Sequence, residues 1–478
     1  MEHLFLRVFR IITILGISLV LVLAIGKDSH GSFTIQDEIK LGREFYEKLK
    51  SKNLLLENKR IVRYVDTIGH DILAGNKSVP FTFTFSVVKS SGINAFATPG
   101  GYIYVYEGLI KLAENEAQLA GVLAHEIAHV NSRHIAESIE KSQKVSLATL
   151  VGILAGVFLG GGGDGTAAIT TLSMAMGTSL NLKYTRENEE EADRLGMKYL
   201  VDAGYDGRGM LEFLKSMRRY EYYSNSIPSY FLTHPGTGDR IRYLDGLLQT
   251  VYTKKGAQSI RGNYDRIKTL VVLSEDNAQS NLNFFQNATK DHPESVDFLF
   301  GLATIQSRVG RNAEALQTFS RALEKSPHDE DLLRGLGICY LHMGRTDDAI
   351  TELNKAYGVN DTNSETIMNL GKAYEAAGNY FIALDLYEKF HTTNPDDTEI
   401  YYHLAMMHGK LNNPGESHYN FGIHFKHKHK LKSALFHFNA ALKFFPEQSE
   451  KNNIIKKEIT ALGDTRRGMP KSHSTERK

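Results

Sequence analysis

The C-terminal half of the chain contains a repeat with a period of 34 residues. Small, aromatic and turn-forming residues return in the same order at each step. The three clearest sets are Ala315, Phe319, Ala322 and Pro327; Ala349, Leu353, Ala356 and Asp361; and Ala383, Tyr387, Phe390 and Pro395. A unit of this length cannot bury its apolar face alone, so successive units have to stack on one another. The repeat therefore predicts an all-α solenoid with a concave groove.

This pattern resembles the tetratricopeptide repeat, in which each unit is a pair of helices. Gly344 and Gly378 lie where the turns between the paired helices are expected, and Asn281 and Phe285 extend the register backwards by one degenerate unit. The groove of such a solenoid normally binds protein segments, so we expect a protein partner there. A purely structural scaffold is the alternative.

Length and charge limit what else the chain can be. Its 478 residues predict two to four domains, and 56 basic against 55 acidic residues give no bulk attraction for nucleic acid. Cys339 is the only cysteine. Because a thiolate metal site needs more than one cysteine, any bound metal has to be held by histidine and carboxylate.

The N-terminus has the layout of a secretory signal. Arg7 and Arg10 precede an apolar run from Ile11 to Ile25, and this run is shorter than the roughly 20 residues that a helix needs to cross a bilayer. We therefore expect a signal peptide at residues 1–26 and export of the chain. An uncleaved anchor in the inner membrane is the alternative.

The next 235 or so residues read as mostly helical with a small sheet. Helices are expected at residues 34–63, 114–142 and 185–203. The strict alternation of Phe81 to Phe85 and the run Tyr102, Ile103, Tyr104, Val105 and Tyr106 predict two strands of a small antiparallel sheet. The apolar, glycine-broken segment from Val145 to Leu180 predicts a helical hairpin over the domain, with peripheral membrane contact as the alternative.

The residues that carry chemistry are His125-Glu126-Ile127-Ala128-His129, inside an apolar helical run. Two histidines four apart lie about 40° apart around a helix, so both rings can reach one zinc ion. Glu126 would then face the attacking water. The alternative is a pair of histidines that are simply solvated or satisfied in the core.

A zinc hydrolase needs a third protein ligand. His134 lies nine residues after His125, on the opposite side of a continuous helix, so we interpret it as a surface or second-contact residue. A carboxylate from a later helix is the better source, and Glu189 and Asp193 are four apart on one helical face. Spacing leaves Glu191 open as a rival ligand.

Together these motifs resemble the zinc endopeptidases related to HtpX and the CAAX prenyl protease, in their BepA-like soluble periplasmic branch with C-terminal tetratricopeptide repeats. The resemblance rests on residues 94–97 and 99–101, on the two motifs from His125 to His134 and from Glu189 to Asp193, and on His234-Pro235 followed by Arg240-Ile241. It implies one Zn²⁺ per chain held by His125, His129 and Glu189, with Asp193 supporting a liganding histidine. It also makes His234 a candidate switch and Arg240 a candidate for oxyanion stabilisation.

The resulting expectation is an α+β zincin-like metalloprotease domain followed by an all-α repeat solenoid. Its boundaries are predicted at residues 27–262 and 263–450, with a basic flexible tail at 451–478. Glu126 is the expected general base, and the strand Tyr102–Tyr106 is the expected edge for an extended substrate. The resemblance implies a periplasmic endopeptidase acting on unfolded or misassembled envelope proteins, with outer-membrane assembly machinery as a partner. A non-catalytic chaperone or adaptor that uses the repeats is the rival function.

Overall fold

The computed structural model describes residues 33–75, 80–140, 146–159, 184–224 and 227–467. The chain divides into two compact units, residues 1–271 and 272–478, and each is described by itself. The predicted signal peptide and most of the predicted hairpin from Val145 to Leu180 lie outside the described residues. Of that hairpin, the structure shows one helix, α7 (Leu147–Leu159).

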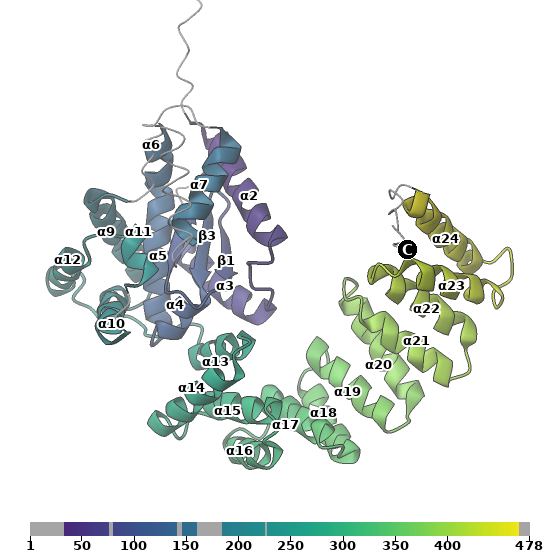
Figure 1. Ribbon diagram of the computed structural model, residues 1–478. Coiled ribbons are helices and arrows are strands. Elements are labelled where there is room, and N and C mark those ends of the chain that lie inside the picture. Colours follow the sequence, from purple (N-terminus) through teal and green to yellow (C-terminus); the bar gives the residue numbers. More distant parts are fainter. Residues whose placement is uncertain (1–32, 76–79, 141–145, 160–183, 225–226, 468–478) are drawn as a thin grey trace, which may run out of the picture. The chain divides into compact units, whose positions relative to one another are not determined.

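The first unit is mostly helical and contains one small sheet (Figure 1). Its remaining elements are α2 (Ile35–Ser51), α3 (Lys59–Ala74), β1 (Thr84–Val88), β2 (Ala95–Thr98), β3 (Tyr102–Tyr106), α4 (Glu107–Leu112), α5 (Glu116–Asn131), α6 (His134–Glu140), α9 (Arg186–Asp202), α10 (Arg208–Ser224), α11 (Ser229–Thr233), α12 (Thr237–Thr250) and α13 (Tyr264–Ser274). None of the helices in the described ranges is long and apolar enough to cross a membrane.

The sheet is mixed, with the strand order β1-β3-β2. β2 and β3 form a hairpin around Gly100 and Gly101, which both have positive φ. β3 lies between β2 and β1 and runs parallel to β1, so the two strands that the sequence predicted pair in parallel. Antiparallel pairing is found between β3 and β2, a strand that the sequence analysis did not predict. The position of β3 agrees with the sequence prediction, whereas β1 begins at Thr84, three residues later than the predicted strand.

The prediction that Tyr102–Tyr106 forms a substrate edge is therefore wrong. β3 is paired with β1 along its whole length and with β2 along most of it, so its backbone N–H and C=O groups are already used. An added strand needs unpaired backbone groups. In the part of the chain that the structure describes, the outer strand on the side of α5 is β2.

Both faces of the sheet are buried, because side chains of opposite orientation enter two different cores. Ile103 and Val105 of β3 belong to a cluster formed with α3, α5 and α10. Tyr104 and Tyr106 point the other way and pack with α2 and α7. Burial on both faces explains why polar alternation is missing from β3.

The start of α5 is fixed by the carboxylate of Glu116. It accepts hydrogen bonds from the hydroxyls of Tyr64 and Tyr205 and from the backbone N–H groups of Ile260 and Arg261, at 2.6 to 2.8 Å. Hydrogen bonds to a charged group stabilise a fold by roughly 1.5–3 kcal/mol each. Glu116 therefore connects α5 to α3 and to the segments after α9 and α12.

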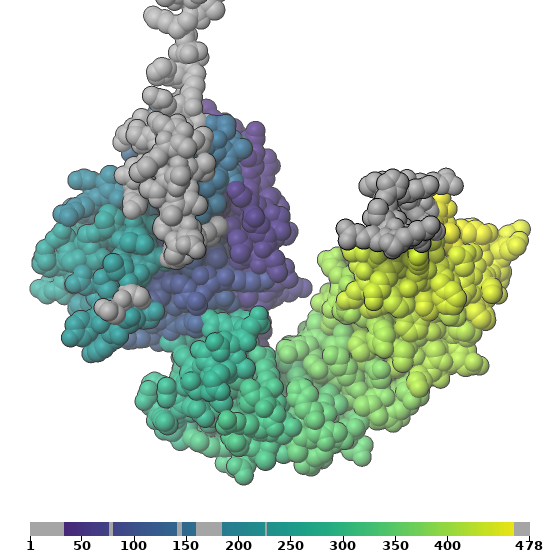
Figure 2. All heavy atoms as spheres, viewed as in Figure 1, coloured from purple at the N-terminus to yellow at the C-terminus, as the bar shows by residue number. Residues whose placement is uncertain are grey.

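The second unit is a series of helix pairs, as the repeat predicts. Its helices are α14 (Ala278–Asp291), α15 (Val296–Arg308), α16 (Asn312–Lys325), α17 (Glu330–His342), α18 (Thr346–Val359), α19 (Ser364–Ala376), α20 (Tyr380–Thr393), α21 (Ile400–Lys410), α22 (Pro414–His427), α23 (Leu431–Leu442) and α24 (Glu450–Arg467). Consecutive helices pack on one another, so the colour changes smoothly from green to yellow along the unit (Figure 2).

The expected flexible tail from residue 451 is helical as far as Arg467. Ile455 and Leu462 of α24 are buried, and together with Ile459 they form an apolar stripe on this helix against α23. Their spacing of four and three residues is typical of a helix, but the sequence analysis overlooked it among the surrounding lysines and asparagines. The tail prediction is therefore wrong for residues 451–467, and residues 468–478 lie outside the described part of the chain.

The aromatic repeat position carries the stacking of neighbouring units. The ring of Phe319 on α16 is fully buried, and it fills the space where a side chain at Gly335 of α17 would lie. We expect Phe319→Ala to cost about 3–5 kcal/mol, because it removes a buried ring and leaves a cavity. Phe381→Ala is the control, since Phe381 is 75% exposed. The stability of both variants is measured by hydrogen exchange of the α15–α17 amides in the full chain. Equal protection in the two variants would contradict the role of Phe319 in stacking.

Candidate metal centre

The helix α5 places two histidines and a glutamate at the centre of the first unit. It begins after Asn115, whose side chain accepts a hydrogen bond from the N–H of Gln118 at 3.0 Å. His125 and His129 lie on the same face, four residues apart, with their Nε2 atoms 3.0 Å apart. Both side chains and that of Glu126 are buried. The structure thus brings the three residues of the predicted motif to one point.

The helix α9 brings the predicted carboxylates to the same point. A capping box formed by Thr185 and Asn188 starts the helix, and Glu189 follows directly after Asn188. The Glu189 oxygens lie 3.4 Å from Nε2 of His125 and 3.4 Å from Nε2 of His129. One turn later, Asp193 Oδ1 lies 3.0 Å from Nδ1 of His125.

Glu191, the rival ligand from spacing, points elsewhere. Its side chain is 46% exposed and contacts Ser132 and His134 rather than the two histidines of α5. It is also absent from the one group of potential metal ligands found among the described residues, which consists of His125, His129, Glu189 and His234.

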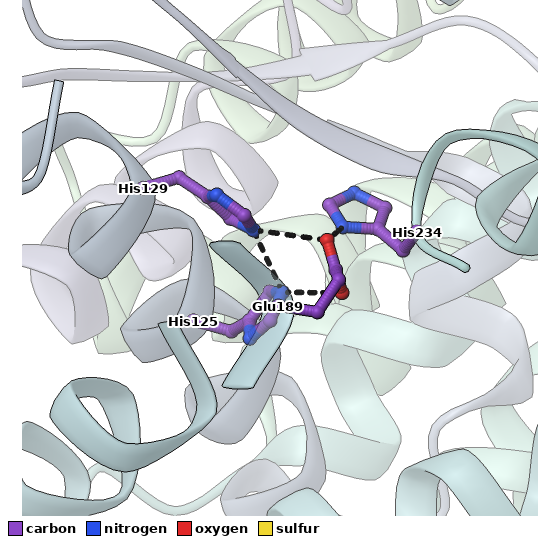
Figure 3. A group of neighbouring side chains, drawn as sticks. All are labelled: His125, His129, Glu189 and His234. Carbon is purple, nitrogen blue, oxygen red and sulfur yellow. Dashed lines mark hydrogen bonds and ion pairs between the residues drawn. The ribbon is translucent and has the colours of Figure 1, made fainter. Parts of the chain in front are cut away.

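The residue directly after α11 is His234, and the first turn of α12 supplies Arg240. The His234 ring is fully buried and stacks on Tyr230. Its Nδ1 lies 2.9 Å from Oε1 of Glu189, and its Nε2 lies 3.5 Å from Oε1 of Glu126. All four potential ligand atoms lie within 4.8 Å of one another, and the four side chains point toward a common centre (Figure 3).

Arg240 is held by carboxylates on α9. Its Nε and Nη2 each lie 2.8 Å from an oxygen of Asp193, and its Nη1 lies 2.6 Å from Oε2 of Glu189. The planar guanidinium matches a carboxylate in this two-point arrangement. An oxyanion role for Arg240 would require some of these contacts to break. The geometry therefore favours a role in which Arg240 orients Asp193 and Glu189.

His134 lies closer to the centre than the sequence indicated. α5 ends at Asn131, Arg133 has a φ of 53°, and α6 starts at His134. This break turns His134 inward, so that its Nδ1 lies 2.8 Å from Nδ1 of His129 and its side chain is buried. The prediction of a continuous helix and the surface alternative for His134 were therefore wrong, while the second-contact alternative agrees with the structure.

The side chain of Tyr184 is a site residue that sequence reasoning missed. Its ring stacks on His129 with centroids 3.7 Å apart, and its hydroxyl forms no hydrogen bond to the described residues. Burial raises the pKa of Tyr184 well above its usual value, so the hydroxyl keeps its proton. Its place in the sequence could have pointed to it, because Tyr184 directly precedes Thr185, the N-cap of the helix that carries the predicted ligand Glu189.

The donor set fits a tetrahedral metal ion. Ligand atoms at about 2.0–2.2 Å from a tetrahedral zinc lie roughly 3.3 Å from one another. The Nε2 atoms of His125 and His129 lie 3.0 Å apart, and each lies 3.4 Å from one oxygen of Glu189, Oε2 for His125 and Oε1 for His129. The side chains also leave buried polar atoms without a hydrogen bond to any described residue, namely both Glu126 oxygens and Nε2 of His234. Buried polar groups are rarely left unsatisfied, so a cation and water are expected among them.

Electrostatics of the cluster depend on the balance of burial and charge. Burial and Arg240 both oppose protonation of His125, but Asp193 and Glu189 outweigh them and raise its pKa to about 9. Burial alone would raise the pKa of Glu189, yet Arg240 and the histidines hold it well below its usual value. Burial raises the pKa of Glu126, which brings it closer to that of a general base at neutral pH.

The residues of this site lie in a region of the chain that matches a known peptidase family. Residues 59–248 match Peptidase family M48, and residues 275–330, 308–362 and 365–397 match tetratricopeptide repeats. The chain is 36% identical over 219 residues to the putative beta-barrel assembly-enhancing protease of Vibrio cholerae serotype O1, which covers 45% of each chain. It is 32% identical over 212 residues to the beta-barrel assembly-enhancing protease of Escherichia coli (strain K12), covering 44% of this chain and 43% of that one.

A more distant relative is the mitochondrial metalloendopeptidase OMA1 of Schizosaccharomyces pombe, 27% identical over 46% of this chain and 63% of the relative. The chain thus matches slightly less than half the length of the beta-barrel assembly-enhancing proteases. Among solved structures, MamA is similar with 18% identity and a TM-score of 0.30, over 32% of this chain and 90% of MamA. The chain therefore combines a peptidase family M48 domain with tetratricopeptide repeats, and the predicted family and fold class are confirmed.

Proposed function

From a peptidase family M48 domain with a buried His-His-Glu cluster, we propose that this chain is a zinc-dependent endopeptidase. The observation that carries the proposal is the set of interatomic distances among His125, His129 and Glu189, which fits a tetrahedral zinc. His125, His129 and Glu189 are the proposed ligands. Asp193 accepts the Nδ1–H of His125 and keeps the Nε2 lone pair of that ring on the metal side.

When bound, a zinc ion supplies Lewis acidity to the attacking water and to the scissile carbonyl. Glu126 then takes a proton from the water and delivers it to the leaving amine. Its two oxygens suit this role, because they are buried next to the cluster and form no hydrogen bond to any described residue. Arg240 holds Asp193 and Glu189 in place during the reaction.

The proposed substrate is an extended polypeptide that pairs with the outer edge of β2. This strand packs against α5, and Ala97 and Thr98 line the same small cavity as His129. Pairing through backbone groups selects strand-like or unfolded segments more than particular side chains. Unfolded or misassembled envelope proteins are therefore the proposed substrates, and the names of the beta-barrel assembly-enhancing relatives support this choice.

The repeats would dock a protein partner, which we propose to be part of outer-membrane assembly machinery. A location in the periplasm, reached through the predicted signal peptide, completes the proposal. The second candidate function is a non-catalytic chaperone or adaptor that uses the repeats. The buried polar atoms around Glu126 argue against it, because an adaptor gains nothing from unsatisfied groups in its core.

The ligand assignment is tested by removing each candidate carboxylate. We expect Glu189→Ala to lose its zinc and Glu191→Gln to keep it. Of the two carboxylates, only Glu189 faces the proposed ligands His125 and His129. Metal content is measured on the full-length protein after dialysis against a fixed free zinc concentration. Zinc retained in Glu189→Ala but lost after removal of the Glu191 side chain would transfer the ligand role to Glu191.

The general base is tested with Glu126→Gln. This variant should bind zinc like the wild type, since Glu126 is not a ligand, while cleavage of an unfolded protein falls by about 100-fold or more. Zinc content is measured on the same sample as the rate. A rate within about tenfold of the wild type, at equal zinc content, would refute the role of Glu126 and favour the adaptor function.

His234 is a proposed inhibitory switch. In the structure it lies inside the cluster, with one ring nitrogen near Glu189 and the other near Glu126, where it would compete with water for the fourth position. His234→Ala should therefore raise self-cleavage and turnover of an unfolded substrate at matched zinc occupancy. A specific loss of activity would instead make His234 a hydrogen-bond donor in the transition state.

A further inference from the structure

The two proposed histidine ligands are supported in different ways. His125 donates its Nδ1–H directly to a buried carboxylate, Asp193, at 3.0 Å. His129 has no carboxylate at that position among the described residues. Its Nδ1 instead faces Nδ1 of His134 at 2.8 Å, and the side chains of both rings are buried.

The contact between two Nδ1 atoms restricts the protonation of both rings. In a hydrogen bond one of the two atoms carries a hydrogen and the other offers a lone pair. The far side of His134 decides between the two choices, because its Nε2 lies 3.4 Å from Oε2 of Glu191 and an ionised carboxylate can only accept. Nε2 of a neutral His134 therefore carries the hydrogen, and its Nδ1 is the acceptor.

It follows that His129 is the donor in the pair. With its hydrogen on Nδ1, the lone pair of His129 is on Nε2, the atom that lies 3.0 Å from Nε2 of His125 and 3.4 Å from Glu189. Glu191 is itself held in place, since it accepts a second hydrogen bond from Ser132 Oγ at 3.2 Å. The chain Glu191–His134–His129 thus selects the one neutral form of His129 that can bind a metal through Nε2.

We propose that His134 is a positioning residue that fixes the tautomer and ring orientation of His129 for zinc binding, with Glu191 orienting His134 in turn. The inference rests on the proposed function, because it takes His129 to be a zinc ligand. It gives Glu191, the rival ligand from sequence spacing, a different role that explains its place beside the site.

The break between α5 and α6 is what makes this contact possible. A continuous helix would carry His134 to the far side from His125, whereas the left-handed backbone at Arg133 turns it back toward His129. Arg133 is held in this conformation by Glu38 and by the carbonyl of Phe33, which tie it to the start of α2. A costly backbone conformation at a site is therefore stabilised from outside it.

The expected loss of zinc affinity can be judged from other metal sites. Loss of a hydrogen-bond partner behind a liganding histidine typically weakens metal binding by about 10-fold to 100-fold. Glu191 should contribute less than His134, because its side chain is 46% exposed and water can replace part of its interaction.

The test is the zinc affinity of the full chain, measured by competition with a chromophoric chelator. His134→Leu should raise the dissociation constant by about 10-fold to 100-fold. His134→Asn should recover part of the loss, because its amide oxygen can accept the Nδ1–H of His129. A merely structural role for His134 would give no such rescue.

Glu191 provides a matched set of surface variants. Glu191→Leu should weaken zinc binding by less than His134→Leu does, and Glu191→Gln should stay close to the wild type because its carbonyl still accepts from His134. Glu190→Leu, one residue earlier on the exposed face of α9, is the control and should have no effect. Because Glu191 is at the surface, these variants test the inference even if His134→Leu does not fold.

The tautomer is read directly by ¹⁵N NMR of the histidine rings. Zinc-bound wild type should show His129 protonated at Nδ1, and this proton should exchange faster with solvent in His134→Leu. Unchanged affinity in folded His134→Leu, or in Glu191→Leu if the former does not fold, would overturn the inference. If the wild type binds zinc but cleaves nothing, the proposed function fails while the role of His134 stands.

Discussion

The backbones of helices α5 and α9 are in direct contact where Gly196 faces His125. A Cβ atom at Gly196 would lie 3.0 Å from the Cα and N atoms of His125, so a larger residue would push the helices apart. Glu189 and Asp193 lie on the same helix within two turns of this contact and reach the histidine rings at 3.0 to 3.4 Å. Without the close approach, a short acidic side chain on α9 could not join two histidines on α5.

Bringing three carboxylates and four histidines into a buried space has an electrostatic cost, and Arg240 offsets much of it. Its guanidinium bridges Asp193 and Glu189, so the pKa of each carboxyl is held below its usual value despite burial. A buried charge pair contributes less to stability than its geometry suggests, because both ions lose their hydration. The arrangement is therefore better explained by the positions it imposes on the proposed ligands than by a gain in folding free energy.

The sequence predicted the elements whose information is local. The repeat period defined the helix pairs, and the spacing of His125, His129, Glu189 and Asp193 defined two helical faces that the structure brings together. Apart from the overlooked stripe of α24, it failed where a result depends on distant contacts. The central position of β3 depends on its pairing with β1, and the inward turn of His134 depends on Arg133, whose positive φ is supported by Glu38, 95 residues away. No local pattern encodes either contact.

The candidate switch and the candidate substrate edge share one attachment point. The N–H of Tyr230 and the hydroxyl of Ser229, both at the start of α11, donate to the carbonyl of Ile93 at 3.1 Å. Ile93 lies two residues before β2, and His234 follows directly after α11 and stacks on Tyr230. A displacement of this end of β2 would therefore reach the ring of His234 through two hydrogen bonds and one short helix. This connection gives an extended chain paired with β2 a direct physical route to the residue that occupies the cluster.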